Sequence, residues 1–108
     1  MGLSDPRLAR ALAALHRSPY EDWTLARMAA MARMPRSAFA AAFKQATGAT
    51  PAAYLTDWRL SLAASMMRSG RAVKLVAAEL GFASASSLSK AFRQRMGVSP
   101  REWLAANA

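Results

Sequence analysis

The sequence predicts an all-α fold of seven helices joined by short loops, and three observations support that prediction. Apolar residues make up 54% of the 108 positions, with much Ala and Met but little Val or Ile, and this composition favours helix over sheet. No segment alternates apolar and polar residues as a half-buried strand would. The two halves of the chain also repeat each other as helices joined by short turns. The length suits one domain with one core.

Capping residues and apolar spacing predict three helices in the first half of the chain. Ser4 or Asp5 can cap the first helix, and Thr24 can cap the second. Gly48 follows the third helix, where a left-handed residue commonly ends a helix. These three predicted helices cover residues 6–16, 25–32 and 36–47.

The second half predicts four more helices by the same rules. Thr50 precedes a long helix that stops at Gly70, and Ser84 caps a later one that Gly97 ends. Ser99 and the proline after it begin the last helix. These four predicted helices cover residues 52–69, 73–80, 85–96 and 101–106.

An internal repeat relates the two halves of the chain. Residues 42–51 match residues 91–100 at an offset of 49, so that Phe43 corresponds to Phe92. Further upstream the offset is 48, and Ala29 corresponds to Ala77. The second copy therefore has one extra residue in the turn between its short helix and its longer helix, where an insertion costs little.

Each copy has the pattern of a helix-turn-helix unit, which is a short helix, a tight turn and a longer helix. The small residues Ala29 and Ala77 allow the second helix to approach closely, and Gly81 suits the turn of the second copy. The first copy has Arg33 at the position of that glycine. The alternative interpretation is a duplicated helical hairpin that does not bind DNA.

The charge of the chain indicates an anionic partner. Lys and Arg number 15 against 6 Asp and Glu, which gives a net charge of +9. Nucleic acid is the first candidate partner and an anionic membrane surface the second. A basic membrane-surface protein and a protein–protein adaptor with the same fold are the alternative functions. Duplex binding that weakens steeply with salt would argue against the adaptor.

Other functions find little support in the sequence. There is no Cys, a single His, no Gly-rich phosphate loop and no evident pair of acidic residues, so we expect no catalysis, metal or cofactor. No apolar run reaches the roughly 18 residues of a membrane span, and the first residues do not resemble a signal peptide. We therefore expect a cytoplasmic protein without a membrane partner.

The outward faces of the two longer helices are the candidate DNA-reading surfaces. On a helical wheel, the inward stripes contain Phe39, Ala42, Phe43 and Ala46 in one copy and Leu88, Ala91 and Phe92 in the other. Residues near the start of each longer helix are placed to contact bases, whereas basic residues and helix starts are placed to contact phosphates. The candidate base contacts are Arg36, Ser37, Ala38, Ala41, Ala85, Ser86, Ser87 and Lys90. The candidate phosphate contacts are Thr24, Lys44, Val73, Lys74, Ser84, Ser89 and Arg93.

The two copies are not equivalent as readers of DNA. Lys90 can donate to guanine O6 or N7, and Ser86 can donate or accept, whereas Ala38 and Ala41 offer only methyl groups. The first unit is therefore expected to anchor the protein and to sense DNA shape and thymine methyls, with help from Arg36. The second unit is expected to read the donor and acceptor pattern.

The chain resembles the C-terminal DNA-binding domain of the AraC/XylS family of bacterial transcription regulators. The resemblance rests on residues 77–84, 88–93 and 97–100, and on Phe39, Phe43-Lys44, 48–51, Tyr54-Leu55 and 58–60 of the first copy. It covers about residues 5–104. Arg33, Ala41, Leu88 and Trp103-Leu104 depart from the family pattern, and Ala41 puts the base specificity of the first unit in doubt.

The resemblance implies two homeodomain-like helix-turn-helix units, in residues 5–50 and 71–106, joined by a linker helix in 51–70 within one domain over 1–108. It implies that the helices over 36–47 and 85–96 enter successive major-groove segments. Such segments are ~34 Å apart, and the linker helix would be ~27 Å long. Family members usually activate transcription, touch RNA polymerase and carry a separate sensing or dimerising domain, which we expect to be missing from this chain.

Overall fold

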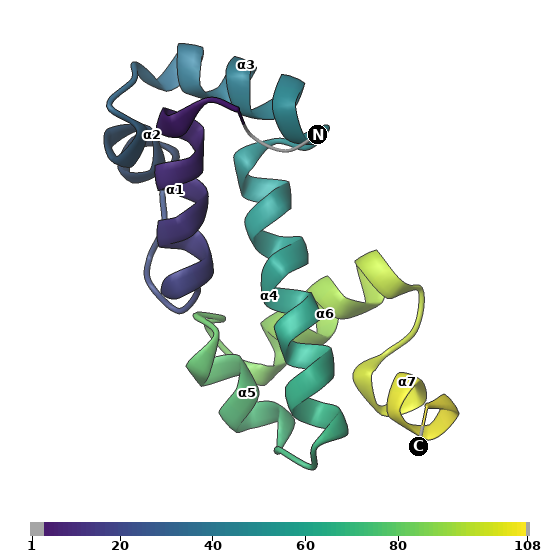
Figure 1. Cartoon of the computed structure of the whole chain (residues 1–108). Coiled ribbons are helices and arrows are strands. Elements are labelled where there is room, and N and C mark those ends of the chain that lie inside the picture. Colours follow the sequence, from purple (N-terminus) through teal and green to yellow (C-terminus); the bar gives the residue numbers. More distant parts are fainter. Residues whose placement is uncertain (1–3, 108) are drawn as a thin grey trace. The chain divides into compact units, whose positions relative to one another are not determined.

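A computed structural model describes residues 4–107, and that part of the chain contains seven helices and no strand. The helices are α1 (Pro6–Arg17), α2 (Leu25–Ala32), α3 (Arg36–Thr47), α4 (Pro51–Arg68), α5 (Val73–Glu79), α6 (Ala85–Met96) and α7 (Pro100–Ala106) (Figure 1). The predicted all-α class is confirmed. Several predicted ends differ from the observed ones by one residue, as is usual where helices fray.

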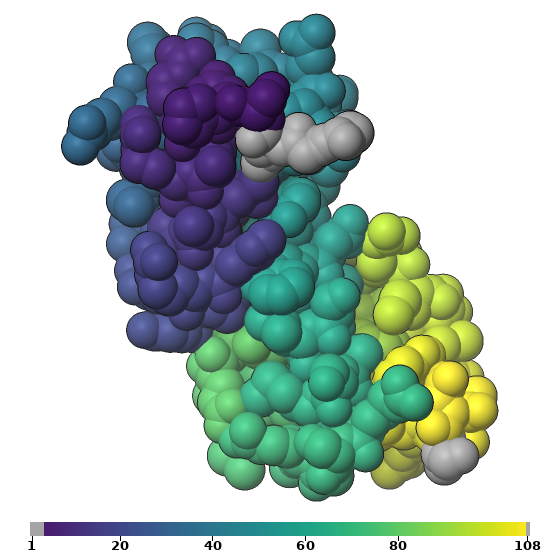
Figure 2. All heavy atoms as spheres, viewed as in Figure 1, coloured from purple at the N-terminus to yellow at the C-terminus, as the bar shows by residue number. Residues whose placement is uncertain are grey.

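The chain forms two compact units, of which the first ends at Leu55 and the second begins at Thr56. Each unit has its own cluster of buried residues, and Figure 2 draws the atoms of the first unit from purple to teal and those of the second from teal to yellow. The first cluster contains Leu8, Ala11, Leu15, Met28, Ala29, Ala32, Phe39, Phe43 and Leu55. The second contains Leu60, Ala63, Met67, Val76, Ala77, Leu80, Leu88 and Phe92. The expectation of one core is therefore wrong, because α4 contributes to two separate clusters.

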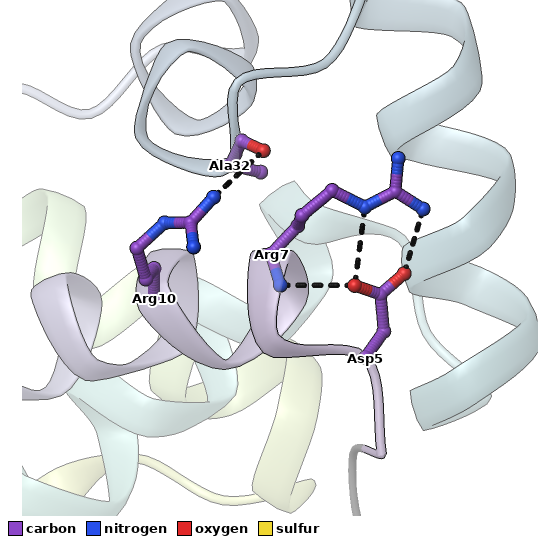
Figure 3. A network of polar contacts seen from close by, with 4 residues as sticks. All are labelled: Asp5, Arg7, Arg10 and Ala32. Atoms are coloured by element: carbon purple, nitrogen blue, oxygen red, sulfur yellow. Dashed lines mark hydrogen bonds and ion pairs between the residues drawn. The ribbon is translucent and has the colours of Figure 1, made fainter.

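The helix starts are fixed by the side chains that the sequence offered as caps. Of the two candidates for α1, Asp5 is the cap, and its Oδ1 accepts from the backbone N–H of Arg7 at 2.9 Å. The Arg7 guanidinium also donates to this carboxylate (Figure 3), and these hydrogen bonds hold the pKa of Asp5 below its usual value. In the same view Arg10 makes a long hydrogen bond, 3.5 Å, to the Ala32 carbonyl at the end of α2.

The turns after α2 and α5 have the same backbone arrangement. Arg33 has a φ of 57° and its counterpart Gly81 a φ of 85°, so both are left-handed. In each copy the next N–H donates back across the turn, from Met34 to the Ala29 carbonyl and from Phe82 to the Ala77 carbonyl, both at 3.0 Å. This hydrogen bond is the Schellman type that ends helices. The turn thus forms in the first copy although it lacks the glycine.

The inward faces of α3 and α6 hold these helices in their units. Phe39 and Phe43 of α3, like Leu88 and Phe92 of α6, are fully buried. Ala46 is exposed, so its assignment to the inward stripe is wrong. On α3, Ala42 and Phe43 are the last residues that pack in the first cluster, and the last turn of the helix extends beyond them. The opposite faces of α3 and α6 are therefore fixed toward solvent.

Candidate nucleic-acid interface

The outward face of α3 carries every candidate contact that the sequence placed there. Arg36, Ser37, Ala38, Ala41 and Lys44 are all exposed. Pro35 precedes the helix and makes no side-chain cap, so no side chain of the described residues caps the N–H groups of the first turn. None of the ion pairs within residues 4–107 involves Arg36 or Lys44. Both cations are thus available to an external anion.

The outward face of α6 is more polar and more constrained. Ser86, Lys90 and Arg93 are exposed, whereas Ala85, Ser87 and Ser89 are half-buried. The Ser84 hydroxyl caps the helix by accepting from the Ser87 N–H at 3.1 Å, and it also lies 3.1 Å from the Ser87 hydroxyl. These contacts hold the Ser84 hydroxyl at the helix start, while Ser86 and Lys90 extend freely into solvent.

Two surface hollows bring several of the candidate residues of the second unit together. One, of about 420 Å³, is lined by Lys74 of α5, by Ser84, Ala85 and Ser86 at the start of α6, and by the turn between the two helices. The other, of about 480 Å³, is lined by Ser89, Lys90, Arg93, Gln94 and Ser99. Both hollows combine cations with hydroxyl groups, which is the chemistry that a phosphate requires.

The remaining candidates lie at the starts of the short helices. Thr24 caps α2 by accepting from the Arg27 N–H at 3.1 Å, so its capping role is confirmed. Val73 is half-buried and packs against the second core. Only its backbone N–H could therefore serve a phosphate, since Ala72 offers no side-chain cap to α5. Contacts of all these residues with DNA stay a prediction.

The structure adds Glu102, an acidic residue that the sequence analysis did not single out. Its Oε1 accepts from the Ser99 N–H at 2.9 Å, and its own N–H donates to the Ser99 hydroxyl at 3.1 Å, which completes a capping box at the start of α7. The same Oε1 lies 3.8 Å from a guanidinium nitrogen of Arg93. The Ser-x-x-Glu pattern at 99–102 is the signature from which this arrangement could have been predicted.

No cluster of His, Asp and Glu within residues 4–107 could hold a metal ion, and no helix in that range is long and apolar enough to cross a membrane. His16 lies on the surface, where its ring stacks on Tyr54 and its Nε2 is 2.8 Å from the phenol oxygen. Burial of the phenol raises the pKa of Tyr54.

Comparison with known proteins gives a consistent result. Residues 28–106 match a family model described as a helix-turn-helix domain. The chain is 43% identical over 103 residues to an AraC-like protein of Streptomyces antibioticus, and 38% identical over 102 residues to RclR, an RCS-specific HTH-type transcriptional activator of Escherichia coli. Each alignment covers 94% of this chain but only 34% and 36% of the relatives, so the chain spans about a third of their length.

Solved structures resemble the chain over nearly its whole length. The DNA-binding domain of AdpA, described as a global transcriptional factor and solved in complex with a target DNA, has a TM-score of 0.87 and 33% identity, covering 95% of this chain and 93% of that one. The C-terminal domain of AraT, a response regulator from Geobacillus stearothermophilus, has a TM-score of 0.88 and 25% identity, covering 94% and 85%.

Proposed function

Because this chain belongs to the helix-turn-helix family of AraC-type transcription regulators, which is not a family of enzymes, we propose that it binds double-stranded DNA sequence-specifically. In this proposal α3 and α6 enter successive segments of the major groove. The observation that carries it is the repeat of one exposed face on two helices, with Lys44 and Arg93 at equivalent positions. The AdpA domain, which was solved on a target DNA, supports it.

The second unit supplies the donors and acceptors that distinguish base pairs. Lys90 is exposed on the outward face of α6 and reaches guanine O6 or N7 in the major groove. Ser86, one turn earlier, donates to or accepts from a neighbouring base edge. Arg93 and Lys74 hold phosphates on either side, each from one of the two hollows.

The first unit anchors the protein more than it reads the sequence. Ala38 and Ala41 present methyl groups, which pack on thymine methyls but form no hydrogen bond with a base edge. Arg36 contacts a base edge beside the start of α3, and Lys44 holds a phosphate. Sequence preference at this half of the site then depends on DNA shape and thymine position.

We extend the proposal to the biological role. The chain regulates bacterial transcription in the cytoplasm as the DNA-binding part of an activator that contacts RNA polymerase. A sensing or dimerising domain accompanies it in this proposal, because the relatives are about three times longer than the matched region. RclR is named a transcriptional activator, and this similarity supports activation rather than repression.

Selection of bound sequences from random duplex DNA tests the function directly. We expect one enriched motif with two parts about one helical turn apart, and the part with stronger base preference should belong to the second unit. Fluorescence anisotropy of the selected duplex in increasing salt should then show a linear fall of log K with log salt. Binding without an enriched motif, or binding that does not change with salt, would contradict the proposal.

A further inference from the structure

The two units differ in the charge beside their equivalent cations. In the second unit the Glu102 carboxylate faces Arg93 at 3.8 Å. The residue that corresponds to Glu102 in the first unit is Ala53, which offers no carboxylate to Lys44. The cap itself is present in both units, since Thr50 accepts from the Ala53 N–H at 3.2 Å. Glu102 is therefore not needed merely to start the helix that follows the turn.

The Glu102 carboxylate is held in place rather than free to swing away. Its Oε1 accepts the Ser99 N–H at 2.9 Å while the Ser99 hydroxyl fixes the Glu102 backbone. Ser99 and Arg93 both line the second hollow, together with Lys90. Hydrogen bonds from Ser99, and to a lesser degree the charge of Arg93, lower the pKa of Glu102, so the carboxylate is fully ionised near neutral pH.

We propose that Glu102 is a fixed negative charge that weakens the electrostatic attraction between Arg93 and DNA phosphate, independently of DNA sequence. The inference rests on the DNA binding proposed above. A phosphate that approaches Arg93 meets a carboxylate within a few ångströms, and the two anions repel each other. Arg93 and Glu102 are 67% and 61% exposed, so their own attraction is weak and does not hold the side chains together against DNA.

The consequence is a limit on how tightly a strongly basic chain holds any duplex. With a net charge of +9, electrostatic attraction alone draws the chain to every phosphate backbone. A fixed anion beside one phosphate contact shortens the time spent on each site without changing which bases are preferred. The first unit has no carboxylate at the equivalent position, because Ala53 stands there, so a phosphate that approaches Lys44 meets no such repulsion.

The test compares matched charge changes. Glu102→Gln removes the charge but keeps a carbonyl oxygen for the Ser99 N–H. Asp57→Asn is the control, because Asp57 pairs at 2.6 Å with Arg95 on a different face of α6, 200° around the helix from Arg93. Affinities for the selected duplex and for a scrambled duplex of equal length are measured by anisotropy across a salt series.

We expect Glu102→Gln to bind both duplexes about three- to tenfold more tightly at low salt. We also expect its salt slope to steepen by up to about one, while Asp57→Asn changes either quantity much less. Weaker or unchanged binding by Glu102→Gln would overturn the inference, as would an equal gain in Asp57→Asn. A wild-type chain that binds neither duplex would overturn the proposed function itself.

A substitution in the first unit tests the same inference without changing the capping box of Ser99 and Glu102. Ala53→Glu places an acidic residue at the equivalent position of the first unit, where Ala53 is exposed. We expect it to weaken binding to both duplexes by a similar factor and to make the salt slope shallower. Unchanged affinity in Ala53→Glu, with a folded protein by thermal melting, would show that this position does not influence the neighbouring phosphate contact.

Discussion

Arg33 sits in a backbone conformation that glycine adopts more easily, and replacing it should stabilise the first unit. With a φ of 57° it is the one non-glycine residue of the described chain in the left-handed region. That region costs an L-residue about 1–2 kcal/mol. Glycine offsets about 0.4–1 kcal/mol of this gain, because it increases the conformational entropy of the unfolded chain. Arg33→Gly should therefore stabilise by about 0.5–1 kcal/mol, which corresponds to a rise in Tm of roughly 3–6 °C.

Differential scanning calorimetry measures this effect and two controls isolate its cause. Arg33 is exposed and has no ion pair within residues 4–107, so its side chain contributes little that the substitution removes. Arg33→Ala keeps the strained backbone and should leave Tm nearly unchanged. Gly97→Ala introduces the strain at φ 83°, where a Cβ would meet no atom within 4 Å. After the same entropy correction, it should destabilise by about 0.5–1 kcal/mol. A lower Tm for Arg33→Gly would refute the reasoning.

Four further predictions concern the site and the two cores. Lys90→Ala should weaken the selected duplex by ~1–3 kcal/mol and relax preference at one base position, and a repeated selection with an unchanged motif would rule out the base contact. Arg93→Ala should weaken all duplexes alike and lower the salt slope by about one, whereas a sequence-dependent loss in anisotropy would contradict a phosphate role. Phe43→Ala and Phe92→Ala should each cost ~3–5 kcal/mol in urea unfolding, because both rings are fully buried and leave cavities. The lowered pKa of Glu102 means that its stabilising contribution is complete above the unfolded value near 4.5 and is lost as pH falls toward the folded value. Acid titration of Glu102→Gln should accordingly show a smaller loss of stability in that range than the wild type.

The helix boundaries could be predicted because the residues that set them act locally. Thr24 and Ser84 accept from N–H groups three residues ahead, and Gly48 and Gly97 take the left-handed conformation that ends a helix. These effects depend on neighbours within one turn and are visible in the sequence. The internal repeat also shows which turn of one copy corresponds to which turn of the other. Arg33 could therefore be identified as the counterpart of Gly81.

Contacts between distant residues were harder to predict. The hydrogen bonds from Arg10 to carbonyls at the end of α2 join residues more than twenty positions apart. The ion pair of Arg95 with Asp57 likewise links α6 to α4. Apolar periodicity shows which face of a helix is buried but not which neighbour covers it. For the same reason the sequence did not predict that Ala46 is exposed. The apolar stripe of α3 continues to Ala46, but the first cluster contains no residue of α3 after Phe43.

The candidate site could be predicted as a surface but not in its detailed contacts. Exposure of Ser37, Lys44 and Lys90 followed from their placement opposite the buried rings. The contact between the Ser84 and Ser87 hydroxyls depends on the rotamers at the start of α6. The pairing of Arg93 with Glu102 depends on how the chain turns between α6 and α7, which helical periodicity does not describe.

The division of α4 between two cores has a practical consequence for anyone who wishes to dissect the protein. Leu55 belongs to the first cluster and Leu60 to the second, although they lie five positions apart on one continuous helix. A fragment cut at residue 55 would end in barely more than one helical turn, which is too short to be stable in water. The first recombinant half would therefore need more of α4 than the five residues 51–55, so part of this helix would have to be encoded in both halves.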